Sequence, residues 1–227
     1  RNEGMDTRHN PEFTTVELYQ AYADFNDMMD LFEDLLSGAA MEILGTYEVD
    51  WQGEHISLAP GWPRMTMAEA VKKHLGIDFM AIEGDAEAVA AAKAAGVDMD
   101  GVEPTWGHAL YECYDQKVEE LMIQPTFITM HPVDVSPLAK RSPKDPRLTE
   151  RFELFICRSE MGNAFSELND PIDQKQRFEK QVELRAKGDD EAGMMDTDFI
   201  NALEYGMPPT GGLGIGIDRC AMLLTGC

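Results

Sequence analysis

The segment Gly206-Met-Pro-Pro-Thr-Gly-Gly-Leu-Gly-Ile-Gly-Ile-Asp-Arg219 carries the strongest structural signal of the 227-residue chain. Its apolar residues recur at every second position from Leu213 to Ile217, which is the period of a β-strand. The residues between them are glycines, and glycine inside a strand marks a place where a ligand or another backbone comes close. Arg219 follows at the start of an apolar run, 220–224, that predicts a helix. A strand with one bare face and an arginine at a helix N-terminus suit a flat ligand that bears phosphate.

A glycine-rich turn that is packed for steric reasons only is the alternative interpretation of this segment. Two common nucleotide motifs do not fit it. A dinucleotide fingerprint needs its third glycine inside the helix, and the chain has no Gly-Lys-Ser/Thr of a P-loop.

The segment 151–169 holds three glutamates in a strand-forming context. A two-residue turn at Cys157-Arg158 would pair Glu153 with Gly162 and make Glu153 and Glu160 diagonal neighbours, about 7–8 Å apart. Two carboxylates at that distance repel each other unless a cation lies between them. Mg²⁺ takes oxygen ligands and shares its sites with nucleotide phosphates, so this pair is a candidate Mg²⁺ site. Two solvated surface acids are the alternative.

Three further residues of this segment have the opposite parity from Glu160: Asn163, Phe165 and Glu167. A β-bulge near Gly162-Asn163 would bring them onto the same face, and glycine is suited to a bulge. A half-buried carboxylate at Glu167 would then select a cation, because burying it without a partner is costly.

Hydrophobic periodicity predicts the remaining elements. Strands are expected over 13–23, as a pair over 46–58, and over 124–130 and 151–168. Helices are expected from 24 to 36 and over 66–74, 83–96, 106–122, 174–187 and 196–205. A capping-box pattern from Thr14 to Glu17 offers a helix start instead, but the period favours a strand there. This irregular order predicts an α+β fold with a largely antiparallel sheet flanked by helices. The expected divisions are a first core segment over 1–64, a helical insertion over 65–122 and a second core segment over 123–227.

The chain opens with Arg1-Asn-Glu-Gly-Met-Asp-Thr-Arg-His-Asn-Pro-Glu-Phe13. Together with 151–170 and 206–219, this segment closely resembles a class II lysyl-tRNA synthetase. The opening is similar to motif 2 of that family and the glycine segment to its motif 3. The resemblance runs through nearly the whole chain and is weakest between about 65 and 122. It implies the catalytic core of the family, from motif 2 through motif 3, as a piece of a longer homodimeric protein.

The resemblance also implies site residues. ATP would be bound by Arg1, Glu3, Arg8, His9, Phe13, Glu153 and Arg219, with Arg1 and Arg219 as the catalytic residues. Lysine would be bound by Glu17, Tyr19, Asn163, Phe165, Glu167 and Gly214. Mg²⁺ would be held by Glu153 and Glu160. The chemistry fits, because a carboxylate that attacks phosphorus needs a guanidinium to bring two anions together and to stabilise the charge that builds up.

The net charge of −23 is at odds with binding of RNA, which wants a basic stripe. The one basic cluster spans 140–147, so we expect weak tRNA binding by this chain alone. Four cysteines without paired spacing argue against zinc and disulfides, and no apolar run has transmembrane length. A reducing, cytoplasmic setting is expected.

The expected reaction converts lysine and ATP to lysyl-adenylate and pyrophosphate, and then transfers lysine to tRNA(Lys) with release of AMP. One alternative is the paralogous enzyme that lysylates a translation factor. The other is a truncated module that binds ATP without turnover.

Overall fold

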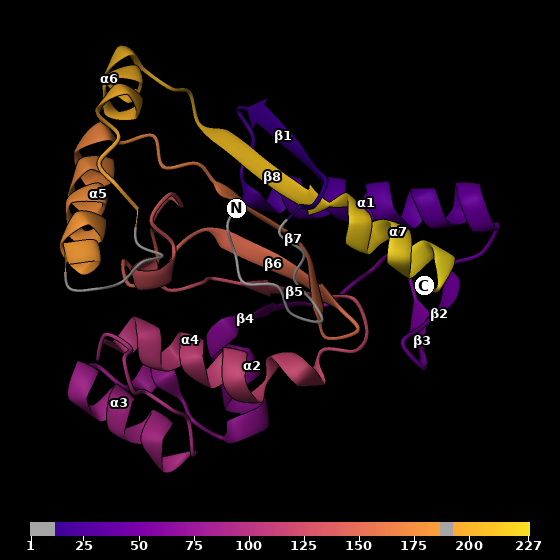
Figure 1. The fold of residues 1–227 in the computed structure, drawn as a ribbon, viewed down its shortest axis with the longest axis horizontal. Helices are drawn as coiled ribbons and strands as arrows, with labels where there is room; N and C mark the ends of the chain where they lie inside the picture. Colours follow the sequence, from indigo (N-terminus) through magenta and orange to yellow (C-terminus); the bar gives the residue numbers. More distant parts are fainter. Residues whose placement is uncertain (1–11, 187–192) are drawn as a thin grey trace.

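The computed structural model describes residues 12–186 and 193–227. Its centre is a six-stranded sheet in the order β1-β8-β7-β6-β5-β4 (Figure 1). The strands are β1 (Thr15–Ala21), β4 (Arg64–Thr66), β5 (Thr126–Thr129), β6 (Arg151–Ile156), β7 (Ser159–Ser166) and β8 (Thr210–Gly216). All neighbours are antiparallel except β4 and β5, which run parallel. A separate hairpin is formed by β2 (Glu48–Trp51) and β3 (Glu54–Ser57). The predicted α+β fold with a largely antiparallel sheet is confirmed.

Helix α1 (Phe25–Leu44) packs along one face of the sheet. It begins where the sequence predicts, because the Asp24 side chain accepts hydrogen bonds from the backbone N–H groups of Asn26 and Asp27. Asp27 in turn accepts from the Asp24 N–H, which completes a capping box. The face that α1 covers is apolar, with Phe152 and Leu213 among its buried residues.

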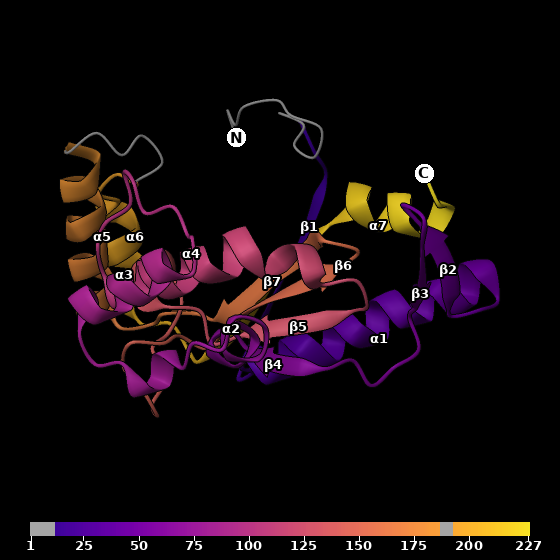
Figure 2. The same cartoon turned by 90° about the horizontal axis from the view of Figure 1, so that it is seen from below.

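Among the described residues, helices cover the other face of the sheet over only a fraction of its width. The chain between β4 and β5 forms α2 (Met67–Leu75), η1 (Phe79–Ala81), α3 (Asp85–Ala94), α4 (Trp106–Lys117) and η2 (Glu119–Leu121). Helices α2, η1, α3 and α4 share one apolar cluster, and it includes Ile128 of β5 and Phe155 of β6. Figure 2 shows α4 and α1 on opposite sides of the sheet. The division of the chain at 65 and 122 stays a prediction.

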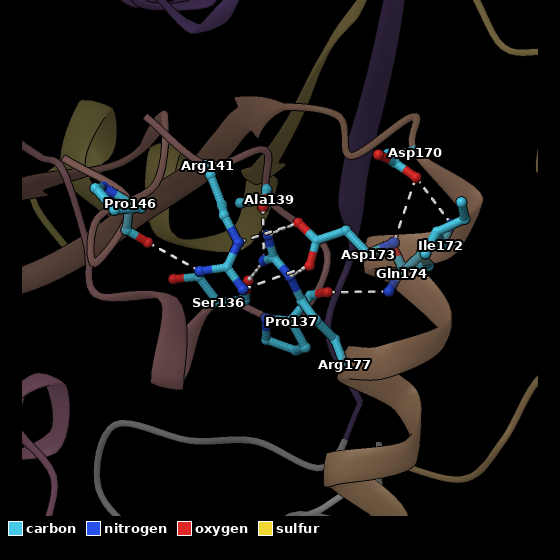
Figure 3. A network of polar contacts seen from close by, with 10 residues as sticks. All are labelled: Ser136, Pro137, Ala139, Arg141, Pro146, Asp170, Ile172, Asp173, Gln174 and Arg177. Carbon is cyan, nitrogen blue, oxygen red and sulfur yellow. Dashed lines mark hydrogen bonds and ion pairs between the residues drawn. The ribbon is translucent and has the colours of Figure 1, made fainter. Parts of the chain in front are cut away.

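Two further helices, α5 (Pro171–Ala186) and α6 (Thr197–Tyr205), precede β8, and α7 (Ile217–Thr225) follows it. Figure 3 shows the polar contacts between α5 and the loop that joins β5 to β6. This loop contains η3 (Val133–Val135). Arg141 and Arg177 both contact the Asp173 carboxylate, and Arg177 also donates to the carbonyls of Ser136 and Ala139 at 2.8 Å. Some of the basic cluster of 140–147 is therefore used within the molecule.

The hairpin of β6 and β7 turns at Cys157-Arg158, as predicted, with φ of 49° and 65° at the two residues. Positive φ at both positions is the geometry of a type I′ turn. The predicted pairing of Glu153 with Gly162 is wrong, since Glu153 lies opposite Asn163.

The register changes because the hairpin contains a bulge. Leu154 pairs with Gly162 and Phe155 with Glu160, which leaves Met161 as the extra residue. Met161 is fully buried in the core on the α1 side. The bulge therefore falls one residue before the expected position, and it brings Asn163 and the residues after it onto the Glu153 face, as the parity argument required.

No helix in the described ranges is long and apolar enough to cross a membrane.

Candidate functional site

The site candidates gather on the region of the sheet that the helices leave uncovered, over β1, β8 and β7. Residues that pair across antiparallel strands point to the same face. Two rows cross the three strands: Glu17, Gly214 and Asn163 form one, and Tyr19, Gly212 and Phe165 form the next. The glycine strand thus lies between two strands whose side chains rise on either side of it.

Glycine is required at position 212 because a carboxylate lies directly over it. A Cβ at Gly212 would be 1.9 Å from Oε1 of Glu167 and 3.0 Å from the Tyr19 ring. A Cβ at Gly214 would meet only the Asn163 carbonyl, at an ordinary 3.8 Å. Gly211 points to the other face, where a Cβ would be 3.0 Å from α1 atoms. The glycines of this strand therefore have two roles. Gly211 allows close packing against α1, and Gly212 keeps the opposite face clear of side chains.

Glu17, Tyr19 and Glu167 lie together on this surface, with Glu17 and Tyr19 exposed and Glu167 half-buried, and the three are called the acidic pocket here. The Tyr19 hydroxyl donates to Oε2 of Glu17 at 2.9 Å, and this bond is the main reason why the pKa of Tyr19 is raised to about 12. Burial, followed by the negative charge of Glu17, raises the pKa of Glu167 to about 7. Within the described ranges, no lysine or arginine forms an ion pair with either glutamate. Two carboxylates that repel each other here make a place for a cation.

A second group of polar residues surrounds Glu153, which is buried. Arg151 donates from Nη2 to Oε1 of Glu153 at 2.6 Å, and Nε2 of the fully buried His131 lies 3.4 Å from Oε2. Burial favours the protonated carboxyl, yet the pKa of Glu153 is lowered, because the ring and the guanidinium face it. Burial also lowers the pKa of His131.

Glu153 and Glu160 lie on the same face of the hairpin, as predicted. Arg219, in the first turn of α7, donates from Nη1 to the Glu160 carbonyl, which brings its guanidinium to the hairpin. The residues fit a magnesium ion in chemistry, since each has carboxylate oxygens and a carboxylate can accept more bonds than the one that Arg151 donates to Glu153. Among the residues that the structure describes, no group of three or more His, Cys, Asp or Glu could hold a metal unaided.

Phe13 is 51% exposed and comes just before β1. The Thr14 N–H donates to the Asp218 carboxylate at 2.7 Å, and the Thr14 carbonyl accepts from the Ile217 N–H. These bonds bring the chain next to Phe13 beside the first turn of α7, where Arg219 lies. Four candidates lie outside the described residues: Arg1, Glu3, Arg8 and His9.

Sequence reasoning missed three residues that the structure places at the site. Arg151 could have been found, because it precedes Glu153 by two residues in a strand and so shares its face. Gly212 could have been found from the same period, which sets it beside Gly214. His131 has no sequence signal, since it follows Met130, whose φ of 58° ends the strand period.

Comparison with known proteins gives a consistent result. The sequence family described as tRNA synthetases class II (D, K and N) matches residues 1–227. A lysine–tRNA ligase of Pelotomaculum thermopropionicum is 59% identical over 227 residues, which is 99% of this chain and 45% of that protein. Lysine–tRNA ligases of Staphylococcus haemolyticus and Staphylococcus aureus (strain MRSA252) are each 57% identical over 225 residues, with the same coverage. The chain therefore spans just under half the length of these relatives.

Proposed function

The chain belongs to the class II tRNA synthetases of the D, K and N group, and on that premise we propose that it is the catalytic segment of a lysine–tRNA ligase. The observation that carries this proposal is the acidic pocket of Glu17, Tyr19 and Glu167 over the bare surface of Gly212. The names of the relatives agree with it, and they favour tRNA(Lys) over a protein as the acceptor.

The pocket suits the ε-ammonium group of lysine. A lysine side chain would supply a positive charge that no described residue gives the two carboxylates, and it would hold Glu167 in its ionised form. A site that pairs the charged group of its ligand discriminates against analogues that lack the amine, because the half-buried Glu167 then loses that partner. Asn163, Phe165 and Gly214 line the adjoining surface of β7 and β8, where the rest of the amino acid would lie.

Activation needs no side-chain base, because the carboxylate of the bound lysine is already ionised. The barrier comes from bringing two anions together, so positioning and positive charge carry the catalysis. Arg219 would stabilise the phosphates from the start of α7, with Phe13 stacked on the adenine. Arg1, Glu3, Arg8 and His9 complete the proposed ATP site by resemblance.

Glu153 and Glu160 are the proposed Mg²⁺ ligands, through carboxylate oxygens on one face of the hairpin. When bound, Mg²⁺ would neutralise charge on the ATP phosphates. The same proposal includes a homodimer in the longer protein and a cytoplasmic, reducing setting. The described free cysteines, Cys113, Cys157, Cys220 and Cys227, agree with that setting.

The test is lysine-dependent exchange between ATP and pyrophosphate, with and without Mg²⁺. We expect exchange in the unsubstituted protein and a loss of about 10³-fold or more in Glu167→Gln, because the lysine ammonium loses its charged partner. Glu42→Gln, an exposed acid on α1, is the matched control and should exchange normally. Exchange that Glu167→Gln leaves intact would refute the assignment of lysine to this pocket. Absence of ATP binding would refute the adenylation chemistry itself.

A further inference from the structure

Arg151 contacts both halves of the proposed site. Its side chain is 16% exposed and lies at the start of β6. Nη2 donates to Oε1 of Glu153 at 2.6 Å, on the phosphate side, and Nε donates to Oδ1 of Asn163 at 3.0 Å, on the amino-acid side. Nη1 donates to the Val135 carbonyl at 2.7 Å and to the Ser136 hydroxyl at 3.1 Å.

The bulge in the hairpin makes this double contact possible. It sets Glu153 opposite Asn163, while Arg151 stands two residues earlier on the same strand and face. In the register without a bulge, Glu153 would face Gly162, and Asn163 would point to the α1 side. One planar guanidinium can serve both partners because its donors point in several fixed directions.

The contact with Arg151 fixes which way the Asn163 amide points. Arginine has donors and no acceptor, so only the carbonyl oxygen of the amide can face it. The Asn163 NH₂ group is therefore turned away from Arg151. Asn163 is thus presented to a ligand as a donor, which suits the carboxylate of an amino acid and not its ammonium group.

The same guanidinium fixes the Glu153 carboxylate. A charge-assisted bond of 2.6 Å holds Oε1, while Oε2 faces the buried His131. Neither carboxylate oxygen can rotate without breaking one of these contacts. The orientation of Glu153 towards the phosphate side of the site therefore depends on Arg151.

Building on the proposed function, we propose that Arg151 is a positioning residue that sets the Glu153 carboxylate and the Asn163 amide together, and so aligns the phosphate side with the amino-acid side. Arg151 acts through these two residues and does not itself touch a substrate. Its contacts with Val135 and Ser136 anchor the guanidinium in the required place.

The test compares Arg151→Lys and Arg151→Gln in the full-length protein by calorimetric binding of lysine and of a non-hydrolysable ATP analogue with Mg²⁺. In Arg151→Lys, the new ammonium group can keep one charged contact with Glu153. It lacks the planar guanidinium that also donates to Asn163. We therefore expect Arg151→Lys to weaken lysine binding by about tenfold or more and to affect the ATP analogue less. Arg151→Gln should weaken the binding of both.

Two controls separate positioning from a merely structural role. Arg158→Lys changes another arginine of the same hairpin, which pairs with Glu54 away from the site, and should leave both affinities within about twofold. Asn163→Ala should weaken lysine binding alone, and adding Arg151→Lys to it should weaken lysine binding little further, because the two act as a unit. The melting temperature of each variant is measured alongside.

The inference would be overturned if Arg151→Lys left the affinity for lysine unchanged. It would also be overturned if the double variant lost as much affinity as the two single losses multiplied together. Absence of lysine binding by the unsubstituted protein is a different result. It would overturn the proposed function and this inference with it.

Discussion

One face of the sheet is built in two different ways. Over β5 and β6 it carries large apolar side chains, Ile128 and Phe155, and the helices between β4 and β5 bury them. Over β1, β8 and β7 it carries glycines, Glu17, Tyr19 and Glu167, and in the described structure no helix covers them. Side chains alternate between the two faces with a period of two in both halves. The period alone therefore does not distinguish a surface that packs into the core from a surface that binds a ligand. The difference lies in what occupies the outward positions: side chains that need burial, or glycines and charges that leave room.

The boundary between the two halves runs along the β6–β7 hairpin. Phe155 belongs to the covered half, while Glu153, two residues earlier on the same face, belongs to a polar cluster. A buried carboxylate this close to an apolar core persists because Arg151 and His131 face it. The hairpin thus joins a structural region to a functional one, and substitutions on either side of it measure how independent the two regions are.

The largest effect is expected from Phe79→Ala in the covered half. Phe79 is fully buried among the covering helices, with its ring 6.1 Å from that of Trp106. Removing it should lower the free energy of unfolding by about 3–5 kcal/mol, because a cavity remains. Denaturant unfolding measures the loss, and the lysine affinity of the folded variant should stay unchanged. A transition that splits in two would show that 65–122 unfolds as a separate unit, whereas weakened lysine binding would break the division between the halves.

Gly212→Ala should act in the opposite way, on function and not on stability. The new Cβ would displace the Glu167 carboxylate, which is the atom group nearest to it, so lysine affinity should fall by about 100-fold, or about 2.7 kcal/mol. Gly38→Ala, on α1, is the matched control, since a Cβ there meets nothing within 4 Å, and it should leave the lysine affinity unchanged. Full lysine affinity in the folded Gly212→Ala variant would show that this glycine is not needed for the position of the Glu167 carboxylate.

The sequence predicted the covered half through its helical stripes and the uncovered half through its glycines, but it misplaced the hairpin register. The position of the bulge depends on Met161, which enters the core under α1, and on Gly162, whose Cβ would lie 2.7 Å from the Phe32 ring. Both are contacts with an element more than a hundred residues away, and no local pattern contains them. The polar partners of Glu153 were missed for the same reason, because they depend on the register. The face of Glu17 and Tyr19 was predicted correctly because it needs only the strand period.

The acidic pocket should make lysine binding depend on pH. The pKa of Glu167 is raised to about 7, so its carboxyl is mostly protonated below pH 7 in the unliganded protein. If lysine binds the ionised form, as proposed, its apparent affinity should fall by about tenfold per pH unit below pH 7 and level off above it. Glu17→Gln removes a negative charge next to Glu167, which should lower its pKa and move the midpoint to lower pH. A flat profile from pH 5 to 8 by calorimetry would contradict the pocket as the place of the ammonium group.

The smallest effect is expected from Thr66→Ala, which removes the N-cap of α2 in the covered half. The Thr66 hydroxyl accepts from the Glu69 N–H at 3.1 Å, and the Glu69 carboxylate accepts from the Thr66 N–H at 2.9 Å. Loss of such a cap costs about 1 kcal/mol, and Thr66→Ser should restore most of it. Asp24→Ala removes the matching cap of α1 under the uncovered half, and we expect a similar loss by denaturant unfolding. If Asp24→Ala also weakened lysine binding while Thr66→Ala did not, the bare half of the sheet would depend on the helix beneath it for its alignment. Equal losses of stability, with lysine binding unchanged in both variants, would instead show that each half is stabilised by its own packing. The β6–β7 hairpin would then be the element that connects the two halves.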